Sequence, residues 1–301
     1  MLNFILIAIC FLAGILIKRI KGLPPGSYKS VNAWIINIAL PAVALKYIPQ
    51  IQWEYSYIIP FLMPLLVWIG SYFFVELLRR FIRMDRKTRA ALFLTAGLGN
   101  TSFLGFPLTE AYYGEEGLQI AVLCDQACFI VMASLGIITA TKASNRGSYS
   151  LTSIVKKIFL FPPFIAFCLA FILPLFLSFK PIAPLLSALA LTLVPLALFS
   201  VGLQLNLSSI RSDMKLVSLA LSYKLVLAPL LILVICLALD LTGFIAKISI
   251  FEAAMAPMVT GTIIAADYGL NPKLANLILG IGIPVSFATT FLWYLIISFM
   301  V

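Results

Sequence analysis

Long apolar segments constrain this chain more than any other feature of its sequence. Along its 301 residues, stretches rich in Leu, Ile, Val, Phe and Ala alternate with short loops that hold most of the basic residues. A helix needs about 20 such residues to cross the hydrocarbon core of a bilayer. Because 62% of the residues are hydrophobic and only 11% are charged, the chain cannot cover a water-exposed surface. We therefore expect an all-α integral membrane protein.

Ten segments are long and apolar enough to be transmembrane helices, which we number as spans 1 to 10. They cover residues 2–17, 31–49, 55–77, 89–111, 117–141, 156–178, 182–206, 213–239, 244–268 and 272–300. Span 1 is expected to be a transmembrane helix rather than a signal peptide, because its basic residues follow the apolar run instead of preceding it. The loops between the spans are too short to hold a soluble domain.

The basic residues indicate which way the spans point. Most of the 21 Lys and Arg residues lie in the loops that follow the odd-numbered spans. The other loops hold Lys180 and Lys247, and three acidic residues cluster near one of them: Glu110, Glu115 and Glu116. Cytoplasmic loops are enriched in Lys and Arg, so both termini should face outside a cytoplasmic (inner) membrane. This placement also accounts for the net charge of +10, and no nucleic-acid partner is expected.

Five spans in each half predict an inverted repeat, because an odd-numbered repeat inserts upside down relative to its twin. The sequence around Pro41 resembles that around Pro195, and residues 111–114 resemble residues 266–269. Both matches are offset by about half the chain length. The predicted five-helix repeats are residues 1–145 and residues 146–301.

Spans 4 and 9 contain Gly and Pro at mid-membrane depth, which interrupts helical hydrogen bonding. Paired broken helices in the two halves of a transporter indicate its substrate site, and their N-termini favour anions. The candidate substrate-binding residues are Gly99, Asn100, Thr101, Ser102, Gly105, Pro107, Pro257, Thr260, Gly261 and Thr262. The alternative is that these glycines only allow helices to pack closely.

Ionisable residues inside the spans are costly and are functional candidates by default. Asp125 lies in span 5 beside Gln126, Glu252 lies in span 9, and Lys224 lies in span 8. The chain has no His, so proton coupling is expected to use carboxylates, and the coupling candidates are Asp125, Gln126 and Glu252. Asp125 could instead make a structural hydrogen bond. Lys224 and Glu252 are predicted to form a structural ion pair between spans 8 and 9.

Three motifs resemble the auxin efflux carrier family of bacterial and plant secondary transporters. They are Asn-Ile-Ala-Leu-Pro at residues 37–41, Gly-Asn-Thr-Ser-Phe-Leu-Gly-Phe-Pro at residues 99–107, and the stretch from Pro257 to Gly269. The resemblance implies a fold like that of the sodium/bile-acid symporters and the plant PIN carriers. In such a fold, spans 1, 2, 6 and 7 form a scaffold that dimerises. Spans 3–5 and 8–10 form a transport domain in which broken spans 4 and 9 cross.

The resemblance also carries residue roles. It makes Asn100, Pro107 and Pro257 the matching site positions, whereas Thr260 stands where family members often have Asn. A hydroxyl offers one hydrogen-bond donor where an amide offers two, so the substrate of this protein is expected to differ from that of better-known relatives.

These observations predict a secondary active transporter or facilitator of small organic anions, chiefly carboxylates, that works by elevator-like alternating access. The alternative is a sodium-coupled symporter of the bile-acid type. A phosphate-binding loop motif is absent from the sequence, which argues against direct drive by ATP. An enzyme, a metal site and a cofactor are not expected, apart from H⁺ or Na⁺ as a coupling ion. The expected partners are the anion, membrane lipid and a second copy in a homodimer.

Overall fold

The computed structural model describes residues 2–20, 24, 26–144, 150–205 and 214–300. Within these residues the secondary structure is helical and contains no β-strand, so the predicted all-helical class is confirmed. The predicted repeat boundary at residues 145 and 146 lies outside the described residues. So do Lys21, Arg146 and Arg211 of the loop charges.

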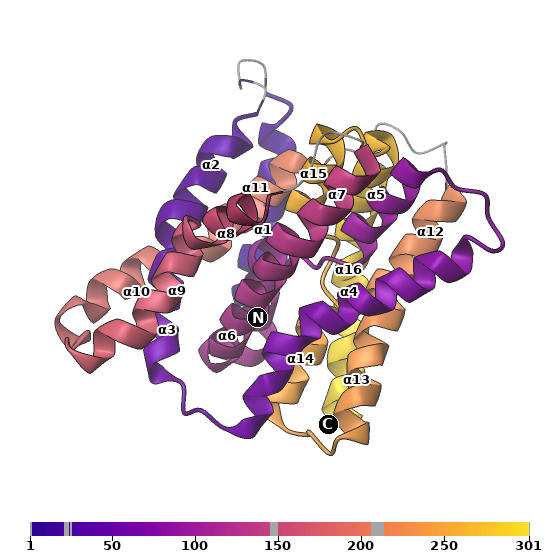
Figure 1. Ribbon diagram of the computed structural model, residues 1–301. Helices are drawn as coiled ribbons and strands as arrows, with labels where there is room; N and C mark the ends of the chain where they lie inside the picture. Colours follow the sequence, from indigo (N-terminus) through magenta and orange to yellow (C-terminus); the bar gives the residue numbers. More distant parts are fainter. Residues whose placement is uncertain (1, 21–23, 25, 145–149, 206–213, 301) are drawn as a thin grey trace. The chain divides into compact units, whose positions relative to one another are not determined.

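The α-helices are labelled in Figure 1 in chain order. They are α1 (Leu2–Ile17), α2 (Tyr28–Trp34), α3 (Leu40–Tyr47), α4 (Ile58–Leu78), α5 (Arg86–Ala96), α6 (Phe106–Val131), α7 (Ile137–Ser144), α8 (Leu151–Phe159), α9 (Pro162–Ile172), α10 (Ala183–Leu191), α11 (Leu193–Gln204), α12 (Met214–Ser222), α13 (Ala228–Ala238), α14 (Phe244–Ala253), α15 (Val259–Asp267) and α16 (Pro272–Met300). The π-helical turns are η1 (Ile35–Ala39), η4 (Thr101–Gly105), η5 (Met132–Gly136) and η8 (Tyr223–Leu227). The 3₁₀ turns are η2 (Ile48–Gln50), η3 (Tyr55–Tyr57), η6 (Leu173–Leu175) and η7 (Lys180–Ile182).

Six helical runs among the described residues are long and apolar enough to cross a membrane: Tyr28–Gln50, Tyr55–Leu78, Thr101–Ser144, Lys180–Gln204, Met214–Ala238 and Pro272–Met300. A seventh is reached if α8 and the segment Pro162–Leu175, bent by 66°, count as one span. The ten-span count therefore stays a prediction. Two features lower the count: α1, α5, α14 and α15 have only 16, 11, 10 and 9 residues, and the run Thr101–Ser144 joins the second part of predicted span 4 to predicted span 5.

The chain divides into two compact units, each assembled from separate stretches of sequence. Unit 1 comprises Met1–Glu54, Ser102–Val122 and Lys156–Leu205. Unit 2 comprises Tyr55–Thr101, Leu123–Val155 and Asn206–Val301. Each unit therefore draws on both predicted five-helix repeats.

In unit 1, α1 packs along α11 through small residues (Figure 1). A Cβ added at Gly14 would clash with the backbone carbonyl oxygen of Phe199, and a Cβ added at Gly202 would clash with that of Phe11. Glycine in both helices thus lets their backbones touch, as is common at membrane helix interfaces. On the other side of unit 1, α3 packs against α9 and α10.

In unit 2, α4, α13 and α14 pack against one another, and α15 packs against α5 and α16. Buried polar side chains find backbone partners between these helices. The Tyr223 hydroxyl donates to the carbonyl of Val67 at 2.6 Å, and the Trp293 indole N–H donates to the carbonyl of Leu225 at 2.8 Å. Such bonds satisfy polar groups that the apolar interior would otherwise leave unpaired.

Candidate functional site

Two interruptions of helical structure lie side by side in unit 2. We call them break A, residues 97–100 after α5, and break B, residues 254–258 between α14 and α15. Gly99 of break A and Pro257 of break B form an antiparallel β-bridge. The Asn100 N–H donates to the carbonyl of Ala256 at 2.8 Å, and the Met258 N–H donates to that of Leu98 at 3.0 Å. The breaks therefore satisfy part of each other's freed backbone.

Local sequence explains why the helices stop here. Pro257 has no N–H and cannot continue the hydrogen-bonding pattern of α14. Glycine at position 99 leaves space for the Lys224 side chain, because an added Cβ would stand 3.3 Å from its ammonium nitrogen. Gly282 of α16 allows a similarly close approach, since its added Cβ would stand 2.8 Å from Cδ of Pro257.

Polar side chains gather at break A. Asn100 is 2% exposed, and its Nδ2 has no hydrogen-bond partner among the described residues. The hydroxyl of the next residue, Thr101, donates to Oδ1 of Asp125 on α6 at 2.7 Å. The neighbouring Gln126 is also buried, and its Oε1 has no partner in the part of the chain that the structure describes. Asp125 thus accepts a hydrogen bond directly after break A, while its coupling role stays a prediction.

Three residues on other elements surround the two breaks. The Lys224 side chain of η8 is 1% exposed, and its ammonium donates to the carbonyl of Ala253 at 2.7 Å. Glu252 is fully buried beside Ala253 at the end of α14. The Cys128 thiol of α6 donates to the carbonyl of Gly99 at 3.5 Å. The predicted ion pair between Lys224 and Glu252 stays a prediction, whereas the contact with Ala253 was not foreseen.

The remaining candidates divide between the two units. Ser102, Gly105 and Pro107 are buried in unit 1. In unit 2, Thr260 is exposed on α15, whereas Thr262 is buried and donates to the carbonyl of Met258 at 3.4 Å. An added Cβ at Gly261 would stand 2.5 Å from the backbone oxygen of Leu94, which favours the close-packing interpretation of that glycine.

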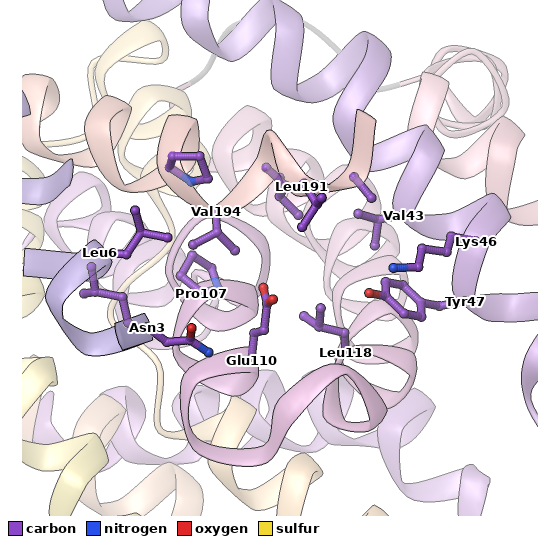
Figure 2. Close-up of a pocket in the computed structure, with 14 residues that line it drawn as sticks. Asn3, Leu6, Val43, Lys46, Tyr47, Pro107, Glu110, Leu118, Leu191 and Val194 are labelled. Carbon is purple, nitrogen blue, oxygen red and sulfur yellow. The ribbon is translucent and has the colours of Figure 1, made fainter. Parts of the chain in front are cut away.

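Unit 1 contains a separate cavity of about 110 Å³ (Figure 2). Its lining residues are Asn3, Leu6, Ile7, Val43, Lys46, Tyr47, Pro107, Glu110, Leu118, Ala190, Leu191, Leu193, Val194 and Pro195. The Lys46 ammonium lies 3.2 Å from Oε2 of Glu115 and 4.6 Å from the centre of the Tyr47 ring. Lys46 lies near the end of predicted span 2, where a lysine is expected to reach the membrane interface rather than to take part in a site; the acidic cluster near residue 110 is the sequence signal for its partner.

Metal ligation has no support in the described part of the chain, where no group of three or more His, Cys, Asp or Glu side chains could hold an ion. The polar groups at the breaks are instead amide, hydroxyl and backbone groups, with buried charges behind them. Such a set can bind a small polar ligand through hydrogen bonds and helix ends.

Comparison with known proteins places these features in a family context. A family model described as "Membrane transport protein" matches residues 2–294. An "Uncharacterized transporter" of Methanothermobacter thermautotrophicus is 26% identical over 298 residues, which cover 97% of this chain and 96% of that protein. A "Putative malonate transporter" of Rhizobium meliloti is 29% identical over 303 residues, which cover 95% of this chain and 92% of that protein.

Proposed function

The chain belongs to the membrane transport protein family, the auxin efflux carrier family that its motifs resemble, and from that premise we propose that it carries small organic anions. The proposed substrates are carboxylates. Malonate is the first substrate to test, because a relative that is 29% identical is named "Putative malonate transporter".

The observation that carries the proposal is the buried amide of Asn100, whose Nδ2 has no partner within the described residues. Leaving a buried donor unsatisfied costs about 1–3 kcal/mol, so a ligand that accepts its hydrogen bonds would relieve this cost. An ionised carboxylate only accepts hydrogen bonds, so either of its oxygens can accept from an N–H of this amide. η4 begins directly after break A and α15 begins directly after break B. Helix N-termini favour anions.

The proposed architecture is a ten-span inverted repeat whose broken spans 4 and 9 cross at breaks A and B. Movement would follow an elevator scheme, with spans 1, 2, 6 and 7 as scaffold and spans 3–5 and 8–10 as transport domain. Unit 1 supports this division, because it contains the sequence of spans 1, 2, 6 and 7. One difference is that Ser102–Val122, which holds the second part of span 4 and the start of span 5, belongs to unit 1. A homodimer, outside termini and residence in the cytoplasmic membrane complete the proposal.

The proposal extends to coupling, with Asp125, Gln126 and Glu252 as candidates that link anion movement to a coupling ion. Asp125 has the strongest support of the three, since Thr101, directly after break A, donates to it. A proton bound there would alter this hydrogen bond, because a protonated carboxyl has one fewer acceptor oxygen.

Uptake of labelled malonate into proteoliposomes tests the proposed function. Uptake should saturate and should be inhibited by unlabelled malonate. Asn100→Ala should reduce uptake at low substrate about 10- to 100-fold, as expected for a lost hydrogen bond to a charged ligand. Asn276→Ala is the matched control, because Asn276 is exposed on α16, and it should transport as the wild type does.

Two results would contradict the proposal. One is wild-type uptake by a correctly folded Asn100→Ala protein, which would remove the site from break A. The other is failure of every carboxylate to move under any imposed gradient. Uptake that disappears when sodium is replaced by choline would instead favour the sodium-coupled alternative.

A further inference from the structure

Break B leaves a backbone carbonyl that the helix itself cannot satisfy. In a continued α14 the carbonyl of Ala253 would accept a hydrogen bond from residue 257, four positions later. Residue 257 is a proline and has no N–H. The last carbonyls of a helix also carry partial negative charge. The end of α14 is therefore a place where a cation is favoured.

The ammonium of Lys224 occupies this place. It donates to the Ala253 carbonyl at 2.7 Å, and its side chain is 1% exposed. It also borders break A, since a Cβ added at Gly99 would stand 3.3 Å from Nζ. One positive charge thus binds the helix end that precedes break B and lies next to Gly99 of break A.

A buried carboxyl lies at the same helix end as this cation. Glu252 directly precedes Ala253 at the end of α14, is fully buried and acts electrostatically on Lys224. A second buried carboxyl, Asp125 on α6, accepts from Thr101 directly after break A. A buried charge without compensation is strongly unfavourable, and the Glu252 carboxyl supplies an opposite charge for the ammonium.

In transporters with broken helices, unwound carbonyls and the C-terminal ends of half-helices coordinate the coupling cation. Here a covalently attached cation stands among groups of that kind. We propose that the Lys224 ammonium is a built-in cation that takes the place of a bound sodium ion at breaks A and B. The inference deepens the proposed function, because it assigns the cation of the same site, and it makes the protein independent of sodium.

Three substitutions separate the charge of Lys224 from its volume. Lys224→Ala removes both and leaves space, Lys224→Met keeps most of the volume without charge, and Lys224→Arg keeps a charge. Lys247→Met, on the less buried face of α14, is the control for losing a lysine. Each purified protein is unfolded by heat in choline chloride, sodium chloride or ethylammonium chloride at equal ionic strength.

The wild type and Lys247→Met should have the same melting temperature in all three salts. Lys224→Ala should melt lower in choline and recover about half or more of the loss in sodium or ethylammonium, because a ligand that binds only the folded state raises Tm. Lys224→Met should melt lower in every salt, since its side chain fills the space. Lys224→Arg should remain insensitive to sodium.

Malonate uptake gives a second readout. Wild-type uptake should be unchanged when choline replaces sodium, while uptake by Lys224→Ala should be about tenfold or more higher in sodium than in choline. Any of four results overturns the proposal: a wild type that requires sodium, a Lys224→Met protein with wild-type Tm, a folded Lys224→Ala protein that responds to neither cation, or a Lys224→Ala protein that cannot be recovered folded in sodium. If the wild type transports no carboxylate, the proposed function fails, and the melting series still decides the role of Lys224.

Discussion

Replacing Gly261 by alanine tests whether this glycine near break B serves close packing. Gly261 lies on α15, and an added Cβ would stand 2.5 Å from the backbone oxygen of Leu94 on α5. Carbon–oxygen contacts require about 3.3 Å, so the helices would have to separate by roughly 0.8 Å. Because the contacted atom belongs to the backbone, a change of rotamer cannot relieve the clash.

The magnitude follows from two opposing effects. Overpacking of this kind costs about 1–3 kcal/mol, whereas replacing glycine by alanine inside a helix stabilises it by about 0.5–1 kcal/mol. We therefore expect a net loss of about 1–2 kcal/mol for Gly261→Ala. Gly136→Ala is the matched control, because its Cβ would meet the Leu94 side chain at 3.4 Å, an ordinary contact. It should leave stability unchanged or slightly raised.

Thermal unfolding of the purified variants measures this difference. At about 2–4 °C for each kcal/mol, Gly261→Ala should melt on the order of 2–8 °C below the wild type. The protein that remains folded should keep the wild-type KM for malonate, because the packing interpretation places no substrate contact at Gly261. A Tm at or above the wild-type value would refute the reasoning, as would an equal loss in Gly136→Ala.

Two further predictions concern helix ends and helix contacts. Hydrogen bonds from the Thr88 side chain and backbone N–H lower the pKa of Asp85, the N-cap of α5, below its usual 3.8. Asp85→Ala should therefore lower the free energy of unfolding by about 1 kcal/mol at neutral pH. This difference from the wild type should shrink as the pH falls from 3.8 through the lowered pKa. An equal difference in Tm at pH 7 and well below pH 3.8 would contradict this. Gly14→Ala should force α1 away from the Phe199 carbonyl of α11 and lower Tm, and a wild-type Tm would show that these helices do not meet through their backbones.

The local sequence predicted some features of the site and missed others. Pro257 and the glycines before Asn100 exclude a regular helix at these positions by their own chemistry. Thr260 and Thr262 are both predicted substrate-binding residues on α15, yet Thr260 is exposed while Thr262 is buried. Spacing along an isolated helix does not specify which of its faces meets the rest of the protein, so the sequence could not separate these two threonines.

Contacts between distant segments were the hardest to predict. Lys46 and Glu115 are 69 positions apart in the chain, and the acidic cluster around Glu115 does not specify which of the many basic residues will contact it. The ammonium of Lys224 donates to the backbone carbonyl of Ala253, a contact that the predicted ion pair with Glu252 did not include. Formal charges are visible in a sequence, whereas a carbonyl freed by a helix break becomes a partner only once its surroundings are known.

The sequence by itself determined the class of this protein. Its composition and long apolar segments require helices that satisfy their own backbone in lipid, and Pro257 fixes by its missing N–H that the Ala253 carbonyl needs another donor. The tertiary structure alone decided which groups meet that need. It paired Gly99 with Pro257 and brought Lys224 to the end of α14, because the partner of a broken helix comes from a segment that only packing brings within hydrogen-bonding distance.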